Sequence, residues 1–185
     1  MNEQKPDAVG EVRQTLITLR IIVFSLAAGV SFFIGYALTS STPEVAQKPI
    51  LWMMMAGLAG SAIVARVVIP RIVFATIRRR IAHRTWQPAT KGAQPQIKTD
   101  EGLLMAALQV KTIIGCAILE AAGFANGFAY MSERQITSLV ITLAIILMIL
   151  AHFPLRFWLD GWLERQKRWI EEERSLIPSD SGVSG

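Results

Sequence analysis

The stretch IIVFSLAAGVSFFIGYALT, residues 21–39, decides the fold class of this chain because it contains 19 consecutive residues without a charged side chain. A helix that crosses about 30 Å of hydrocarbon needs roughly 20 predominantly apolar residues. Arg20 stands directly before the stretch, where its long side chain can reach the lipid headgroups. A secretory signal is the weaker alternative, because its apolar part is typically about 7–15 residues long. We therefore predict a first transmembrane helix over 21–39.

Three further apolar runs follow, and together the four predict an all-α membrane protein with a transmembrane domain over 16–155. The later helices are expected at about 50–70, 103–131 and 135–155. The second run begins after a proline and carries Trp52 in its first turn, where aromatic residues of the membrane interface are common.

Polar segments separate and flank these runs. Residues 1–15 are predicted to form a cytoplasmic arm, and 71–101 is the most basic segment of the chain. Within it, 87–96 contains prolines and a glycine and is typical of a loop. An amphipathic helix lying in the membrane interface on the cytoplasmic side is predicted over 156–177, and the Ser- and Gly-rich tail 178–185 is expected to be disordered. The apolar face of that helix consists of residues at helical spacing: Leu155, Trp158, Leu159, Trp162, Trp169 and Ile170.

Composition agrees with a membrane protein and excludes several other classes. Charged residues make up 18% of the chain, whereas soluble domains contain about 25%. The net charge of +5 is concentrated in one segment that lacks a nucleic-acid-binding module, so nucleic acid is not an expected partner. Cys116 is the single cysteine, and the two histidines, His83 and His152, are far apart in sequence. We therefore expect no internal disulfide, no metal site and no cofactor.

The distribution of Lys and Arg predicts the orientation in a bacterial inner (plasma) membrane. The loops at 40–49 and 132–135 hold one such residue each, Lys48 and Arg134, whereas the central segment 71–101 holds seven. Because basic residues are retained on the cytoplasmic side, this predicts that the central segment and both termini are cytoplasmic.

Glu120 is the most informative polar residue. It lies 11 positions before Met131, the end of the third run, and hence about 16 Å deep. Arg66 is a candidate partner, while Lys111 is expected on the other side of the helix and close enough to the inner surface to reach it; Gln109 shares the face of Glu120. The carboxylate either makes a structural contact between helices or binds a proton or cation.

Two further groups of residues are candidates for contacts. Small residues four apart allow helices to approach closely, as in the pairs Gly57 with Ser61 and Gly123 with Gly127. A basic cluster could bind anionic lipid headgroups or act only as a determinant of topology; its members are Arg78, Arg79, Arg80 and Arg84.

The segment AILEAAGFANGFAY, residues 117–130, resembles the carboxylate-bearing helix of the rotary ATP synthase c subunit. It also looks like a helix of uncharacterised small bacterial multi-helix membrane proteins. The resemblance covers one helix and implies a proton-binding role for Glu120. The c subunit, however, is a two-helix hairpin with its carboxylate on the second helix, whereas Glu120 lies on the third of four predicted helices.

The chain lacks a phosphate-binding loop, a nucleophile–histidine–acid set and a metalloprotease motif, so no enzymatic activity is predicted. We expect an accessory or structural membrane protein that acts by association with itself or with another membrane protein. The rival expectation is a proton- or cation-handling protein built around Glu120.

Overall fold

The computed structural model describes residues 5–40, 50–88, 97, 99–154 and 156–176. This part of the chain is all-α and contains no strand. Residues 1–4 of the predicted arm, most of the loop at 40–49 and the predicted tail lie outside the described residues. The helices are α1 (Lys5–Thr39), α2 (Leu51–Ala82), α3 (Asp100–Glu133), α4 (Ile136–Leu150) and α5 (Arg156–Ser175).

Two helices are longer than the apolar runs that predicted them. α1 begins at Lys5, so residues 5–15 of the expected arm are helical. α2 continues without interruption through Pro70 to Ala82. The ring of Pro70 is buried against Gly115 of α3, where its Cγ lies 3.7 Å from the position of an added Cβ. α2 and α3 are therefore in van der Waals contact at the proline.

The fourth helix is shorter than predicted. α4 ends at Leu150 rather than at 155 and contains 15 residues. His152 N donates to Ile149 O and Phe153 N to Leu150 O, which tightens the last turn. Pro154 disfavours a helical conformation for the residue before it, and this explains the early end. Three helices are long and apolar enough to cross a membrane, namely α1, α2 and α3, and α4 is a shorter apolar helix.

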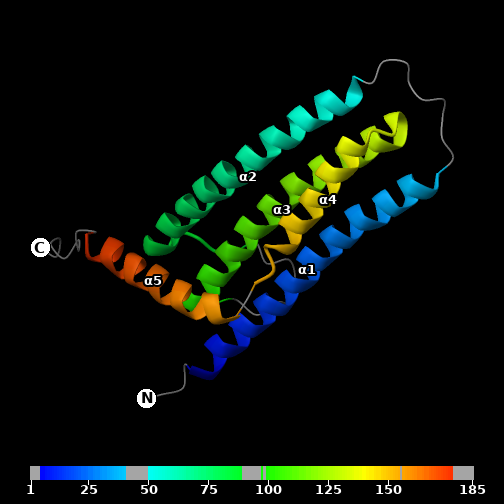
Figure 1. Ribbon diagram of the computed structural model, residues 1–185. Coiled ribbons are helices and arrows are strands. Elements are labelled where there is room, and N and C mark those ends of the chain that lie inside the picture. The colour runs from blue at the N-terminus through cyan, green and yellow to red at the C-terminus, as the bar shows by residue number, and fades with distance from the viewer. Residues whose placement is uncertain (1–4, 41–49, 89–96, 98, 155, 177–185) are drawn as a thin grey trace, which may run out of the picture.

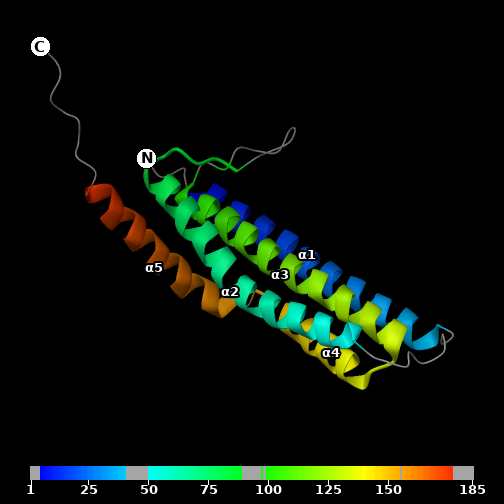
Figure 2. The same cartoon turned by 90° about the horizontal axis from the view of Figure 1, so that it is seen from above.

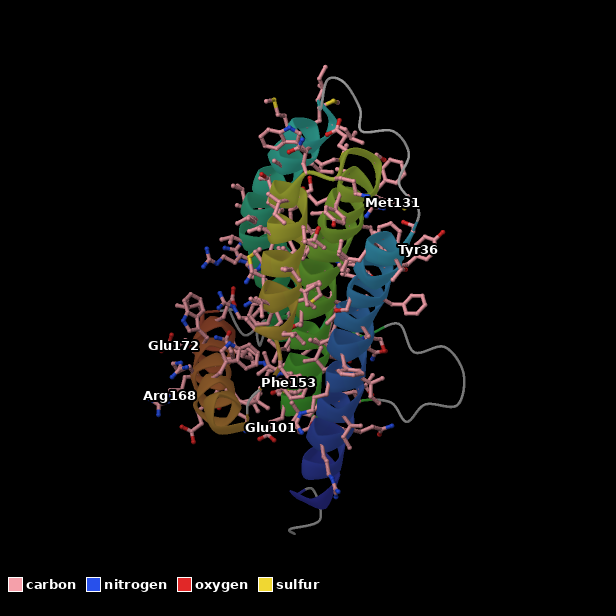
Figure 3. All side chains as sticks on the ribbon, turned by 45° about the vertical axis from the view of Figure 1, so that its right-hand side comes forward. Tyr36, Glu101, Met131, Phe153, Arg168 and Glu172 are labelled. Carbon is pink, nitrogen blue, oxygen red and sulfur yellow. The ribbon has the colours of Figure 1, made fainter. Side chains whose placement is uncertain are left out.

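α3 is the central helix of the bundle. It contacts each of the other four helices, whereas α1 and α2 lie on either side of it and do not contact each other within the described residues. Figures 1 and 2 show α4 running beside α3, with contacts to both α1 and α2, and α5 crossing obliquely at one end. We call this end the α5 end. Figure 3 shows Tyr36 and Met131 at the opposite end and Glu101 at the α5 end.

Buried apolar residues form two separate cores. The bundle core joins the four helices α1, α2, α3 and α4. It consists largely of small or β-branched residues: Leu19, Val23, Ala27, Val30, Ile34, Ala37, Ala59, Ala62, Cys116, Leu119, Ala122, Ile145, Ile146 and Ile149. The α5 core joins α5 to the ends of α1, α2 and α3 and contains Leu16, Phe74, Ile77, Ile81, Ala82, Leu104, Met105, Ala107, Leu108, Leu159, Trp162, Leu163 and Ile170.

The apolar side of α5 is covered by protein. Leu159, Trp162, Leu163 and Ile170 are buried in the α5 core, and Trp162 packs on Phe74 with 5.6 Å between ring centroids. Of the residues expected on the face in the lipid interface, Leu159, Trp162 and Ile170 are thus buried against protein, whereas Trp169 is exposed.

Exposed large apolar side chains form a band around the bundle. They occur from Ile17 to Leu38 on α1, from Met53 to Ile72 on α2, and from Ile136 to Phe153 on α4 and its end. At 1.5 Å per residue, the bands on α1 and α2 are about 28–32 Å long, close to the thickness of a hydrocarbon layer. Towards the α5 end, Trp169 and Leu176 are the exposed large apolar residues in the described part.

Candidate functional site

Glu120 lies on α3 beside α1 rather than beside α2. Its Oε1 is 3.6 Å from the position that a Cβ on Gly29 would occupy, and the ring of Phe124 is close to the same point. Glu120 and its predicted partner Arg66 form no ion pair in the described structure. Nor does any described residue donate a hydrogen bond to this carboxylate. Glu120 is thus a half-exposed carboxylate without a polar partner inside the described chain.

The side of α3 that carries Glu120 is the side that the bundle leaves open. Ala117, Ala121 and Phe128 are exposed, and Glu120 and Gln109 are half-exposed. This open face exists because α1 and α2 flank α3 without meeting, while α4 covers the other side, as Figure 2 shows. Gln109 lies along the same edge as Glu120, as the spacing predicted. The small side chains of Ala117 and Ala121 would allow another helix to pack closely against this face, beside the Glu120 carboxylate.

The other predicted polar residues, Arg66 and Lys111, lie where α2 and α3 pack together. Beside Gly115, the position of an added Cβ is 4.0 Å from Arg66 Cγ and 3.9 Å from His152 Nε2. Lys111 Nζ lies 5.3 Å from the centre of the Phe74 ring, in a cation–π contact. Arg66 and Lys111 both lie within electrostatic reach of His152. The structure therefore places Arg66 beside His152 and Lys111 over Phe74, and neither cation forms an ion pair with Glu120 within the described residues.

Sequence reasoning did not find His152 as a neighbour of these cations. Its Nδ1 lies 2.7 Å from Met148 O, one helical turn back. This contact orients the ring, and Nε2 faces Gly115. The proline two residues later was a signal that α4 ends here, but only the packing of α3 against α2 shows which cations His152 meets.

The small-residue pairs behave differently on the two helices. A Cβ on Gly123 would lie 2.9 Å from Val30 Cγ1 and 3.3 Å from Ile145 Cγ2, and one on Gly127 would lie 3.0 Å from the ring of Phe33. These glycines therefore hold α3 close to α1 and α4. Gly57 has no atom within 4 Å of an added Cβ. It is exposed with its predicted partner on α2, Ser61.

Two arginines of the basic cluster contact side chains of α5. The guanidinium of Arg78 lies 4.0 Å from the centre of the Trp169 ring and donates to Gln166 at 3.5 Å. Arg79 forms an ion pair with Glu173 at 3.7 Å. The remaining cluster members are exposed, namely Arg80 and Arg84. The cluster therefore holds α5 as well as supplying positive charge.

Ion pairs also join α5 to the first turn of α3. Arg174 donates to both carboxylate oxygens of Asp100 at 2.8 and 2.9 Å, and Lys167 pairs with Glu101. The hydrogen bonds with Asp100 raise the pKa of Arg174. Thr99 caps the same turn, because its side chain accepts from Gly102 N.

At the opposite end, the adjacent residues Glu133 and Arg134 bind the ends of two other helices. The Glu133 carboxylate is buried and accepts from Leu51 N at 2.7 Å and Trp52 N at 2.9 Å, at the start of α2. Arg134 donates to Ala37 O at 2.8 Å, at the end of α1. Each charge has the sign that stabilises the helix end it contacts. The sequence indicated a tight turn here, but not which helix ends it would join.

Asn126 is a second buried polar contact that the sequence did not single out. Its Nδ2 donates to Met55 O at 3.0 Å and to Ala122 O at 2.9 Å. The first bond ties α3 to α2 inside the band of exposed apolar residues. Among the described residues, no group of three or more His, Cys, Asp and Glu side chains could hold a metal ion.

Comparison of the chain with protein-family models, curated proteins and solved structures found no match.

Proposed function

We propose that the protein crosses the membrane four times, with α4 as the fourth span. The apolar band supports this, because exposed apolar residues on α4 and its end continue from Ile136 to Phe153, beside the bands of α1 and α2. The ends of α4 lie near charged helix contacts, at Arg134 on one side and Arg20 on the other. A 15-residue helix is about 22 Å long, and the three residues after it extend the apolar segment.

The proposed orientation puts the α5 end and both termini in the cytoplasm. Basic residues are concentrated there, on the last turns of α2 and on α5. The α5 core lies beyond the apolar band, so α5 is proposed to rest at the cytoplasmic surface against the ends of α2 and α3.

The proposed role is that of an accessory or structural membrane protein that docks a transmembrane helix of a partner on the open face of α3. A single observation carries this proposal: Glu120 is a carboxylate within the apolar band that has no polar partner in the described chain. A charged side chain at that depth is costly unless it is paired or neutral. A partner helix that brings a hydrogen-bond donor to Glu120, and packs on Ala117 and Ala121, would satisfy it.

Site-specific photo-crosslinking in native membranes tests this docking. A photoreactive amino acid at Ala117 or Ala121 should give one defined crosslinked product, whereas the same group at the lipid-facing Leu143 should not. Glu120→Leu should abolish the product, and Glu120→Gln should retain part of it, because the amide still forms a hydrogen bond. An identical product in Glu120→Leu, or one of equal yield from Leu143, would contradict the proposal.

The second candidate function is proton or cation handling by Glu120. The same lack of an internal partner favours it, since a carboxylate that is not committed to an ion pair is free to exchange a proton. Flux of protons or cations into proteoliposomes distinguishes the two functions. A flux that Glu120→Gln abolishes would support ion handling, whereas equal flux in wild type, Glu120→Gln and protein-free vesicles would leave the docking role.

A further inference from the structure

Several cations gather around the end of α4 on its α2 side. Beside Gly115 of α3, the position of an added Cβ lies 4.0 Å from Arg66 Cγ of α2 and 3.9 Å from His152 Nε2 at the end of α4. Lys111 is one helical turn before Gly115 on α3, and its Nζ lies 5.3 Å from the centre of the Phe74 ring of α2. Arg71, five residues beyond Arg66 and three before Phe74 on α2, is close enough to Lys111 to interact with it. α2, α3 and the segment after α4 thus contribute two arginines, a lysine and an imidazole to the same part of the α2–α3 contact.

This basic site lies at the border of the apolar band. The last exposed large apolar residue on α2 is Ile72, and the exposed apolar residues beside α4 end at Phe153. Arg71 precedes Ile72 by one residue, and His152 precedes Phe153. Arg71 and His152 are therefore at the depth where phosphate groups of lipids meet the hydrocarbon, and Arg66, six residues before Ile72, can extend its long side chain towards it.

The cations of this site lack carboxylate partners within the described residues. The ion pairs among the described residues join α5 to α2 and α3, nearer the end of the molecule. None of them includes Arg66, Arg71 or Lys111. Lys111 contacts the face of the Phe74 ring, which leaves its ammonium without a counter-charge. Arg78 and Arg79 of the basic cluster, by contrast, both contact α5.

Packing, rather than orientation in the membrane alone, accounts for their proximity. The Arg66 stem and the His152 ring approach α3 at the same level, beside Gly115. α4 stops at Leu150, which leaves this part of the α2–α3 pair uncovered by α4. Like charges brought together in this way repel one another unless an anion lies among them.

We propose that Arg66, Arg71, Lys111 and His152 form a binding site for a phosphate group at the cytoplasmic border of the membrane. Arginine supplies planar paired donors and lysine a point charge, the two modes by which proteins hold phosphate. The phosphate is either that of an anionic lipid headgroup or that of a soluble phosphate compound. Basic sites between transmembrane helices on the cytoplasmic side are typical of lipid headgroup binding.

Native mass spectrometry of the full chain tests the site with two probes. Wild type, incubated with equal amounts of dioleoyl phosphatidylglycerol and dioleoyl phosphatidylcholine, should retain the phosphatidylglycerol preferentially. Arg66→Gln combined with Lys111→Gln should lose that preference. Arg80→Gln combined with Arg84→Gln removes the same charge from exposed residues away from the site and should keep it. Thermal unfolding in a neutral detergent with added inorganic phosphate, compared with chloride of equal ionic strength, tests the soluble source.

Lipid preference or phosphate-specific stabilisation that depends on Arg66 and Lys111 supports the site and identifies the source. Equal loss in both double variants would overturn it, because the effect would then be one of net charge. Absence of both effects in wild type would also overturn it. If the first double variant does not fold, the single variant Arg71→Gln replaces it, since Arg71 is exposed and its loss removes no packing.

Discussion

The bundle core and the α5 core are built from different residues although the same three helices run through both. In the bundle core, glycines, alanines and β-branched residues bring the helices close, and the exposed surface is apolar. In the α5 core, tryptophan, phenylalanine and leucine side chains fill the space, and ion pairs surround them. The difference is the one expected if, as proposed, the bundle lies in lipid and α5 at an aqueous surface. In lipid, helices gain little by burying apolar area and depend on close contact, whereas in water burial itself drives packing.

The largest expected effect concerns the α5 core. Trp162→Ala should destabilise the attachment of α5 by about 3–5 kcal/mol, because it removes a buried aromatic side chain that packs on Phe74. Hydrogen exchange of α5 amides in detergent measures this directly. Trp169→Ala is the matched control, since Trp169 is half-exposed and should cost much less. Equal exchange in the two variants would show that α5 is not held by its buried face.

Close packing in the bundle core should respond to added volume. Gly123→Val should cost about 1–3 kcal/mol, because the new side chain would collide with Val30 and Ile145. Gly57→Val is the control, as Gly57 has open space around it. Unfolding in a titration of denaturing detergent gives the comparison. If Gly57→Val proves as harmful as Gly123→Val, the exposed small residues of α2 must contact a partner.

The helix caps opposite α5 offer a smaller test of the bundle. Glu133→Ala removes the acceptor for two backbone N–H groups at the start of α2 and should destabilise the protein by about 1–2 kcal/mol. Thermal unfolding monitored by circular dichroism measures the loss. Ser132→Ala, at the preceding residue, is expected to have little effect, and a similar loss in both would indicate disruption of the turn rather than of the cap.

The smallest expected effect is that of an ion pair beside the α5 core. Asp100→Asn should weaken the contact with Arg174 by roughly 1 kcal/mol or less, since both side chains are partly exposed to solvent. The wild-type protein should show faster proteolysis of α5 at high salt, and the variant should respond less to salt. A salt response that Asp100→Asn leaves unchanged would assign it to the other pairs of α5.

Much of the all-α fold could be predicted because the signal is local. Apolar runs with few charges indicate helices, and the runs at 21–39, 50–70 and 103–131 each coincide, to within one residue, with part of a long apolar helix of the structure. The end of the fourth helix was predicted wrongly, because hydropathy continues to Leu155 whereas the backbone is already constrained by Pro154.

The candidate site could be predicted only residue by residue. The sequence identified Glu120, Arg66 and Lys111 as polar residues in apolar surroundings, and depth along each helix made an Arg66–Glu120 pair plausible. It could not give the rotation of α3 about its axis, which turns Glu120 to Gly29 of α1 and brings Gly115 to Arg66 and His152. That rotation depends on contacts between residues about ninety positions apart, such as Gly123 with Val30.

The sequence by itself determined that this protein is helical, apolar and asymmetric in charge, because these properties arise from neighbouring residues and their solvent. Only the tertiary structure decided which charges meet. The Glu133 carboxylate caps α2, the Arg66 stem lies beside His152 at the end of α4, and Lys111 lies over Phe74. Glu120 lies at the edge of an open face. The physical reason is that a side chain's partners are set by how whole helices pack, and packing is a property of the assembled chain.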